Sequence, residues 1–273
     1  MFGAQSEVNL MVEDKTIVIE LTNRCNMKCV KCPRQRYLEK WGKAGQGFMR
    51  FGTFNKILSE TDKQRNHYVI GWRGEPTWNK DFPEMIRKLV QYKHQSSRIT
   101  VVTNGVFIPT GNLKGQVLVN VKEVYEALTL VDRIVFSLHN RLSLKGYKLY
   151  LENYYSEDLG QEVWPTTVEG MDPNFSVIPP RGGYRNVLTE WSTVKNPGKR
   201  AKCRRIGKEI AIGWDGRVSR CYFHWDTDPM YMIGLYTVDE LFEKYIKPLA
   251  SKYPDEICSA CPLKKTRAPY ESG

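Results

Sequence analysis

The sequence predicts an α/β fold in which parallel strands alternate with helices, and three observations support this prediction. Short apolar runs rich in β-branched residues recur along the first half of the chain, at 16–21, 68–70, 98–103 and 132–138. Amphipathic segments with the spacing of a helix separate these runs. Asp or Asn stands before two of the segments, at the position of a helix cap. Alternation of this kind favours βαβ units and a parallel sheet, either open or closed.

Length and composition predict a soluble, cytoplasmic protein. The chain has 273 residues, enough for one large domain or for one domain with a small appendage. Mean hydropathy is −0.49, no apolar run is long enough to span a bilayer, and no apolar leader with a cleavage site is seen, so we expect no membrane partner. Seven cysteines in a reducing compartment indicate metal binding rather than disulfides.

Three helices are predicted between the strands. The first spans 54–61, the second follows Asp81, and the third runs from 120 to about 130. An acidic residue stands three positions after the Asp or Asn that begins the second and third helices, which is typical of a capping box. After Asn140 the regular alternation fades, and a fifth strand is predicted over 175–178.

The loop after the first strand carries three cysteines. Cys25, Cys29 and Cys32 follow one another in the spacing Cys-x3-Cys-x2-Cys. Thiolates are soft ligands that select iron–sulfur clusters or zinc. Three ligands are one short of the four that a closed site takes, so we infer a cluster with one open position. The alternative is a zinc knuckle or scattered core cysteines.

Polar motifs follow three further strands. Gly74 and Glu75 come after the second strand, Thr103 and Asn104 after the third, and Ser137 ends the fourth. Parallel strands finish at a common edge, where ligands of such folds bind. We therefore expect these residues near the cysteine loop, although each motif alone is also ordinary turn chemistry.

A second set of cysteines occupies the last third of the chain. Its members are Cys203, Cys221, Cys258 and Cys261. A β-hairpin is predicted over 209–220 around an Asp-Gly pair, and a capped helix begins at Thr237. We expect a small metal-stapled module, for which zinc and a closed 4Fe–4S cluster both suit the four thiols.

The first cysteine motif resembles the signature of the radical S-adenosylmethionine (radical SAM) superfamily, and the resemblance extends over residues 16–140. It implies a partial, TIM-like barrel of parallel strands over residues 1–195. It also implies that the first three cysteines hold a 4Fe–4S cluster whose open iron binds S-adenosylmethionine (AdoMet). The second cysteine set resembles the C-terminal SPASM or twitch extension, which implies a twitch module over residues 196–273 with one auxiliary 4Fe–4S cluster.

The resemblance also implies contacts with AdoMet. Gly74 and Glu75 match the Gly-Gly-Glu stretch that receives the amine of AdoMet, while the contacts to its carboxylate and ribose fall at Thr103, Asn104 and Ser137. Two positions depart from the family pattern. Arg73 replaces the first glycine and is a candidate for the AdoMet carboxylate or the substrate. Lys31 stands where an aromatic side chain usually contacts adenine.

Charge favours an anionic substrate. Net charge is +11, and a basic surface attracts anions. Trp191, Trp214 and Trp225 lie near a basic run, and cations interleaved with aromatic rings suit stacked bases and phosphates. The run consists of Lys195, Lys199, Arg200, Lys202, Arg204 and Arg205, and Lys264, Lys265 and Arg267 follow the last cysteines. A solvated basic face is the alternative.

The resemblance implies an enzyme that cleaves AdoMet reductively and abstracts a hydrogen atom from its substrate, and the charge favours a nucleotide or a nucleic-acid-borne base as that substrate. The resemblance implies a reductant protein, such as a flavodoxin or a ferredoxin, as partner. Two other radical SAM activities remain open, namely dehydrogenation of a small alcohol or sugar-like metabolite and maturation of a peptide. A non-enzymatic zinc protein that binds nucleic acid is the alternative of a different class.

Overall fold

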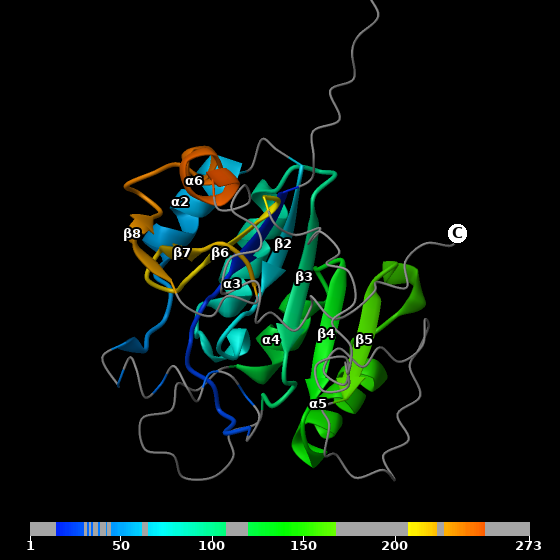
Figure 1. The fold of residues 1–273 in the computed structure, drawn as a ribbon. Coiled ribbons are helices and arrows are strands. Elements are labelled where there is room, and N and C mark those ends of the chain that lie inside the picture. The colour runs from blue at the N-terminus through cyan, green and yellow to red at the C-terminus, as the bar shows by residue number, and fades with distance from the viewer. Residues whose placement is uncertain are drawn as a thin grey trace, which may run out of the picture.

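The computed structural model describes residues 15–29, 32, 34, 38, 42, 45–61, 65–107, 120–167, 207–222 and 227–248. Within these residues, eight strands form one sheet in the order β5-β4-β3-β2-β1-β6-β7-β8 (Figure 1). The strands are β1 (Lys15–Ile19), β2 (Asn66–Ile70), β3 (Arg98–Thr103), β4 (Arg133–Leu138), β5 (Glu162–Thr167), β6 (Glu209–Ile212), β7 (Arg217–Ser219) and β8 (Asp228–Met232). Pairings among β1 to β6 are parallel, whereas β7 pairs antiparallel with β6 and β8.

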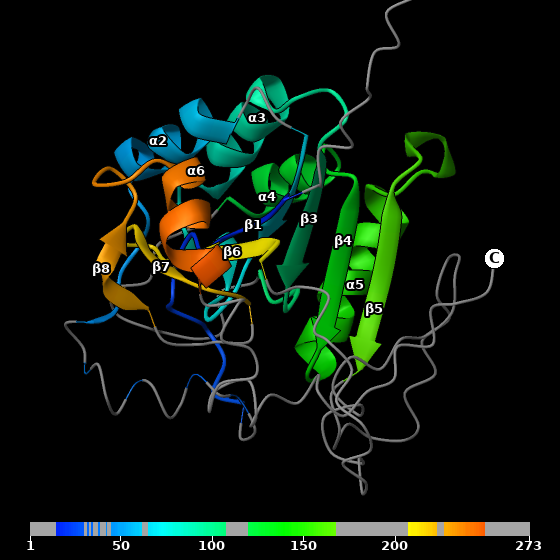
Figure 2. The same ribbon diagram turned by 45° about the horizontal axis from the view of Figure 1, so that its top comes forward.

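Helices α2 to α5 cover one side of this sheet (Figures 1 and 2). The helices are α2 (Phe51–Thr61), α3 (Phe82–Tyr92), α4 (Val121–Leu128), α5 (Arg141–Asn153) and α6 (Val238–Leu241), which a π-helical segment, η5 (Phe242–Ile246), continues; single 3₁₀ turns are η2 (Pro76–Trp78) and η3 (Glu157–Leu159). No helix among the described residues combines the length and apolar character needed to cross a bilayer.

The main core lies between the sheet and these helices. Ile17, Tyr68 and Ile99 occupy neighbouring positions on β1, β2 and β3, and each is fully buried. Because the three strands are parallel and pair in register, their carboxyl ends lie along one edge of the sheet. The loops after β1, β2 and β3 are therefore neighbours in space.

The predicted strands and helices of the first half are confirmed to within a few residues. Asn120 caps α4, with its side chain accepting from Glu123 N–H. Thr237 and Glu240 form the predicted capping box of α6. The capping box predicted at Asp81 is wrong, because its side chain makes no cap hydrogen bond. The backbone of Asp81 lies in the bridge region rather than the extended conformation of a typical cap (φ −88°, ψ 3°).

Two elements that follow β4 were not predicted, namely α5 and β5. Helix α5 packs the aromatic rings of Tyr147 and Tyr150 on Phe136 instead of presenting an aliphatic stripe. Strand β5 contains Pro165, which argues against a central strand, but β5 is the edge of the sheet, where proline is tolerated. The strand predicted over 175–178 lies outside the described residues.

The C-terminal hairpin extends the main sheet. Strands β6 and β7 form the predicted hairpin, and Gly216 in its turn has a positive φ of 87°. Strand β6 pairs in parallel with β1, so the hairpin continues the main sheet, while the twitch module over residues 196–273 stays a prediction. Strand β8, which adds a further antiparallel pairing, was not predicted. The predicted boundary between residues 195 and 196 lies outside the described residues.

Candidate functional site

Three loops meet at the carboxyl edge of the sheet, one after each of β1, β2 and β3. The backbone N–H of Glu75 donates to the carbonyl oxygen of Arg24 at 2.8 Å, which ties the second loop to the first. The side-chain amide of Asn26 donates to the carbonyl oxygen of Val106 at 2.6 Å, which ties the first loop to the third. The structure thus brings together motifs that the sequence places on three separate strands.

Glu75 is a buried link between the second and third loops. One carboxylate oxygen accepts hydrogen bonds from the amide and hydroxyl of Thr77 (3.2 and 2.8 Å) and from the hydroxyl of Thr103 (2.7 Å). The other oxygen accepts from the backbone N–H of Asn104 at 2.7 Å. Burial raises the pKa of Glu75, and these hydrogen bonds act against the rise. The carboxylate is therefore engaged with the protein, and its contact with AdoMet stays a prediction.

Gly74 lets the second loop pack directly on the cysteine loop. A Cβ at this position would lie 2.3 Å from the carbonyl oxygen of Thr22 and 2.4 Å from that of Arg24. Both neighbours belong to the backbone, so neither can rotate aside as a side chain can. Close packing accounts for this glycine independently of any ligand.

We expect Gly74→Ala to displace the cysteine loop, because its Cβ would overlap two backbone oxygens. The variant should lose about 1–3 kcal/mol of unfolding free energy and about half of its iron, that of the first cluster, measured by thermal unfolding and by iron analysis after anaerobic reconstitution. Gly52→Ala in α2 is the matched control, since its Cβ would meet nothing within 4 Å. Wild-type iron content in Gly74→Ala would contradict the expectation.

The side chain of Asn104 reaches the cysteine loop. Its Nδ2 donates to Oδ1 of Asn26 at 2.8 Å and to Sγ of Cys25 at 3.6 Å, while its Oδ1 accepts from the backbone N–H of Val106 at 2.8 Å. The backbone N–H of Met27 donates to the same sulfur at 3.4 Å. Hydrogen bonds of this kind stabilise negative charge on a cysteine ligand. Asn104 thus holds Cys25, and its AdoMet contact stays a prediction.

The three cysteines of the loop are partly buried free thiols. Burial raises the pKa of Cys25, to about 12, and also that of Cys29 and Cys32. The charge of Arg34 opposes this effect on the pKa of Cys25 and Cys32. Within the described residues, no three ligand side chains are placed to hold a single metal ion. A 4Fe–4S cluster needs a wider arrangement, because each cysteine binds a separate iron atom.

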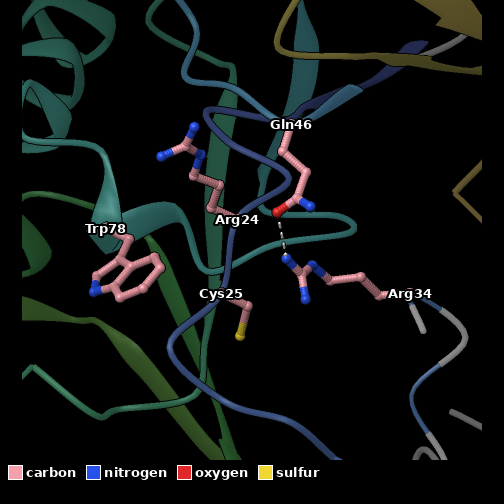
Figure 3. Close-up of a pocket in the computed structure, with 5 residues that line it drawn as sticks. All are labelled: Arg24, Cys25, Arg34, Gln46 and Trp78. Atoms are coloured by element: carbon pink, nitrogen blue, oxygen red, sulfur yellow. Dashed lines mark hydrogen bonds between the residues drawn. The ribbon is translucent and has the colours of Figure 1, made fainter. Parts of the chain in front are cut away.

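A cavity of about 330 Å³ adjoins Cys25 (Figure 3). Its other lining residues are Arg24, Arg34, Gln46 and Trp78. The sequence did not identify these four as site residues, because they come from separate segments that only the packing of the loops brings together. The cavity places two cations and an aromatic ring beside a predicted cluster ligand.

Arg73 is buried in an ion pair with Glu20. Its Nε donates to Oε1 of Glu20 at 2.7 Å and its Nη2 to Oε2 at 2.5 Å. The guanidinium also stacks over the ring of Trp72, 4.1 Å from the ring centroid. Backbone N–H groups of Arg73 and Trp214 donate to the same carboxylate (3.3 and 3.2 Å). Glu20 thus joins the ends of β1, β2 and β6, and an AdoMet contact for Arg73 stays a prediction.

The other predicted site residues divide into two groups. Ser137 lies near the carboxyl end of β4, the neighbour of β3, and its role stays a prediction. Cys221 follows β7 and is half-buried. Outside the described residues lie Cys203, Cys258, Cys261, Lys31, Trp191, Trp225 and the basic residues between 195 and 205 and between 264 and 267.

Comparison by sequence finds one distant curated relative. No family model matches the chain. The tungsten-containing aldehyde ferredoxin oxidoreductase cofactor-modifying protein of Pyrococcus furiosus is 26% identical over 151 residues, which are 54% of this chain and 40% of that protein. The chain therefore spans less than half the length of this relative.

Comparison by structure finds BtrN. The structure of BtrN in an open conformation has a TM-score of 0.57 and 12% identity, covering 95% of this chain and 98% of BtrN. The structure of BtrN in complex with AdoMet and 2-DOIA has a TM-score of 0.61 and 14% identity, covering 91% of this chain and 92% of BtrN. The described residues thus form an eight-stranded mixed α/β sheet, and the fold is similar to that of BtrN, a protein that binds AdoMet.

Proposed function

We propose that this chain is a radical SAM enzyme. In this proposal Cys25, Cys29 and Cys32 hold a 4Fe–4S cluster, and AdoMet binds at the iron that lacks a protein ligand. The observation that carries the proposal is the Cys-x3-Cys-x2-Cys loop at the carboxyl edge of a BtrN-like sheet. The distant likeness to a cofactor-modifying protein also supports it.

The donor set fits such a cluster. Three thiols on one loop can each bind one iron atom, and the sulfur of Cys25 accepts two N–H hydrogen bonds that favour its charged form. Partial burial of the thiols limits the access of water and oxidants. When bound, the cluster would supply the electron that breaks the S–C5′ bond of AdoMet, giving methionine and a 5′-deoxyadenosyl radical.

The chain itself would position the reactants. Asn104 and Asn26 hold the cysteine loop against the loop after β3, and Glu75 holds that loop against the one after β2. Rigid attachment of this kind keeps a target C–H bond beside C5′ of AdoMet, which is the main contribution of a protein to a radical reaction. Thr103 and Ser137 stay candidates for the contacts to AdoMet.

We propose an anionic substrate, with a nucleotide or a nucleic-acid-borne base as the first candidate. The cavity beside Cys25 supports it, since two guanidinium groups and Trp78 suit a phosphate or carboxylate joined to a planar ring. A small metabolite is the second candidate, favoured by the presence of 2-DOIA with AdoMet in BtrN. Filter binding of single-stranded RNA over a salt series separates them, because a log K slope near zero or no binding excludes nucleic acid.

The partial barrel, the twitch module and the second cluster belong to the same proposal. Cys203, Cys221, Cys258 and Cys261 would hold an auxiliary 4Fe–4S cluster, and a flavodoxin or a ferredoxin would deliver electrons to the enzyme. Metal analysis of anaerobically purified protein tests the proposal. We expect a brown protein with about eight iron atoms that forms 5′-deoxyadenosine from AdoMet under reductant. A colourless protein with about two zinc ions and no AdoMet cleavage would exclude it.

A further inference from the structure

Arg34 is a buried cation without a carboxylate partner among the described residues. Only 6% of its surface is exposed. Its Nε donates to the carbonyl oxygen of Asn23 at 2.7 Å, and its Nη2 donates to Oε1 of Gln46 at 3.2 Å (Figure 3). These neutral oxygens satisfy hydrogen bonds but leave the positive charge unbalanced. A buried charge of this kind is costly unless an opposite charge lies nearby.

The cysteine loop offers that opposite charge. Arg34 and Cys25 line the same cavity, and Arg34 lies two residues after Cys32. Arg24 lines the same cavity but is exposed, so Arg34 is the buried cation placed to balance thiolates in this loop.

We propose that Arg34 is the built-in counter-charge of the cluster and raises its reduction potential. The inference rests on the proposed function. Three thiolates outweigh the positive charge of an iron–sulfur core, so the complex is an anion that becomes more negative on reduction. A buried cation stabilises the reduced form more than the oxidised form, because charge interactions are strong where water is excluded. Local charge is one of the factors that set the potential of such clusters.

A structural role makes a different prediction. If Arg34 served only as a clamp between Asn23 and Gln46, its effect would depend on its fork of N–H donors and not on its charge. Arg34→Lys keeps the charge and loses the fork, whereas Arg34→Gln loses both. Gln46→Glu keeps the clamp and neutralises the arginine with a carboxylate at the same position. These three variants therefore separate charge from geometry.

The experiment is a redox titration monitored by electron paramagnetic resonance on anaerobically reconstituted protein. The relevant signal is the one that changes when AdoMet is added. Arg34→Gln and Gln46→Glu should each lower the midpoint potential by at least about 59 mV. For one electron this shift corresponds to a tenfold change in the equilibrium constant for reduction. Arg34→Lys should shift it by less than a third of that. Lys28→Gln is the matched control, because Lys28 is a cation beside Cys29 but is exposed and screened by water.

The outcomes of this experiment either support or overturn the inference. A wild-type potential in iron-loaded Gln46→Glu or Arg34→Gln overturns the inference, and Gln46→Glu provides this test even if Arg34→Gln loses iron. Equal shifts in Arg34→Lys and Arg34→Gln overturn it as well, in favour of the clamp. A wild-type chain that binds no iron overturns the proposed function and the inference with it, which is a distinct result.

Discussion

Replacing Cys29 with alanine should abolish formation of 5′-deoxyadenosine from AdoMet. Two thiolates do not retain a cluster that three normally hold, so the iron at which AdoMet would bind is lost together with the cluster. The fold should survive, because the turn between Cys29 and Cys32 is held by a backbone hydrogen bond of 3.1 Å, which alanine preserves. The product is measured by chromatography after incubation with reductant. Iron should fall by about half, since the proposed second cluster remains.

Cys221→Ala is the matched control for this prediction. Cys221 is also a half-buried cysteine, but it follows β7 rather than β1. Its loss should remove the other half of the iron and leave AdoMet cleavage measurable. Wild-type cleavage by Cys29→Ala would remove the central assignment of the cysteine loop. Full iron content in Cys221→Ala would instead contradict only the auxiliary cluster.

The predictable part of this fold is the part with local signals. Strands β1 to β4 each have an apolar run, and α4 and α6 have caps that a reader can recognise from a few residues. The pairing of β6 with β1 joins segments that are far apart in the sequence, with Thr16 opposite Glu209, and no local pattern indicates it. Helix α5 was missed for another reason. It contains Gly146, and a glycine inside a segment lowers its helix propensity. The glycine is nevertheless required, because a Cβ there would lie only 1.8 Å from the carbonyl oxygen of Gly105.

The candidate site also has a part that the sequence predicts and a part that depends on the packing of the chain. The cysteine spacing and the strand-end motifs are visible in sequence, so Gly74, Glu75 and Asn104 could be placed near the cysteines. Their hydrogen-bond partners could not, because the bonds depend on how three loops pack. Glu20 did carry a signal that was overlooked. It directly follows β1, and Arg73 lies three residues after β2, so the two opposite charges stand just beyond the ends of neighbouring parallel strands.

That ion pair supports a prediction about stability and function together. Arg73→Met should lower the unfolding free energy by about 3–5 kcal/mol, because it leaves the carboxylate of Glu20 buried without its cation. The side chains are 3% and 0% exposed, so water cannot replace the lost partner. The measurement is equilibrium unfolding in urea. Lys122→Ala is the control, since Lys122 pairs with Glu126 on an exposed helix face and should cost less than about 1 kcal/mol.

The double variant Glu20→Met with Arg73→Met separates the two roles of Arg73. Removing both charges also removes the desolvation penalty, so the double variant should recover most of the lost stability. Recovery should extend to AdoMet cleavage if Arg73 acts only through Glu20, by holding the ends of β1 and β2. If Arg73 contacts AdoMet directly, the double variant will be stable and still bind AdoMet poorly. A double variant as unstable as Arg73→Met would contradict the pairing itself, because the buried carboxylate would then not be the cause of the loss.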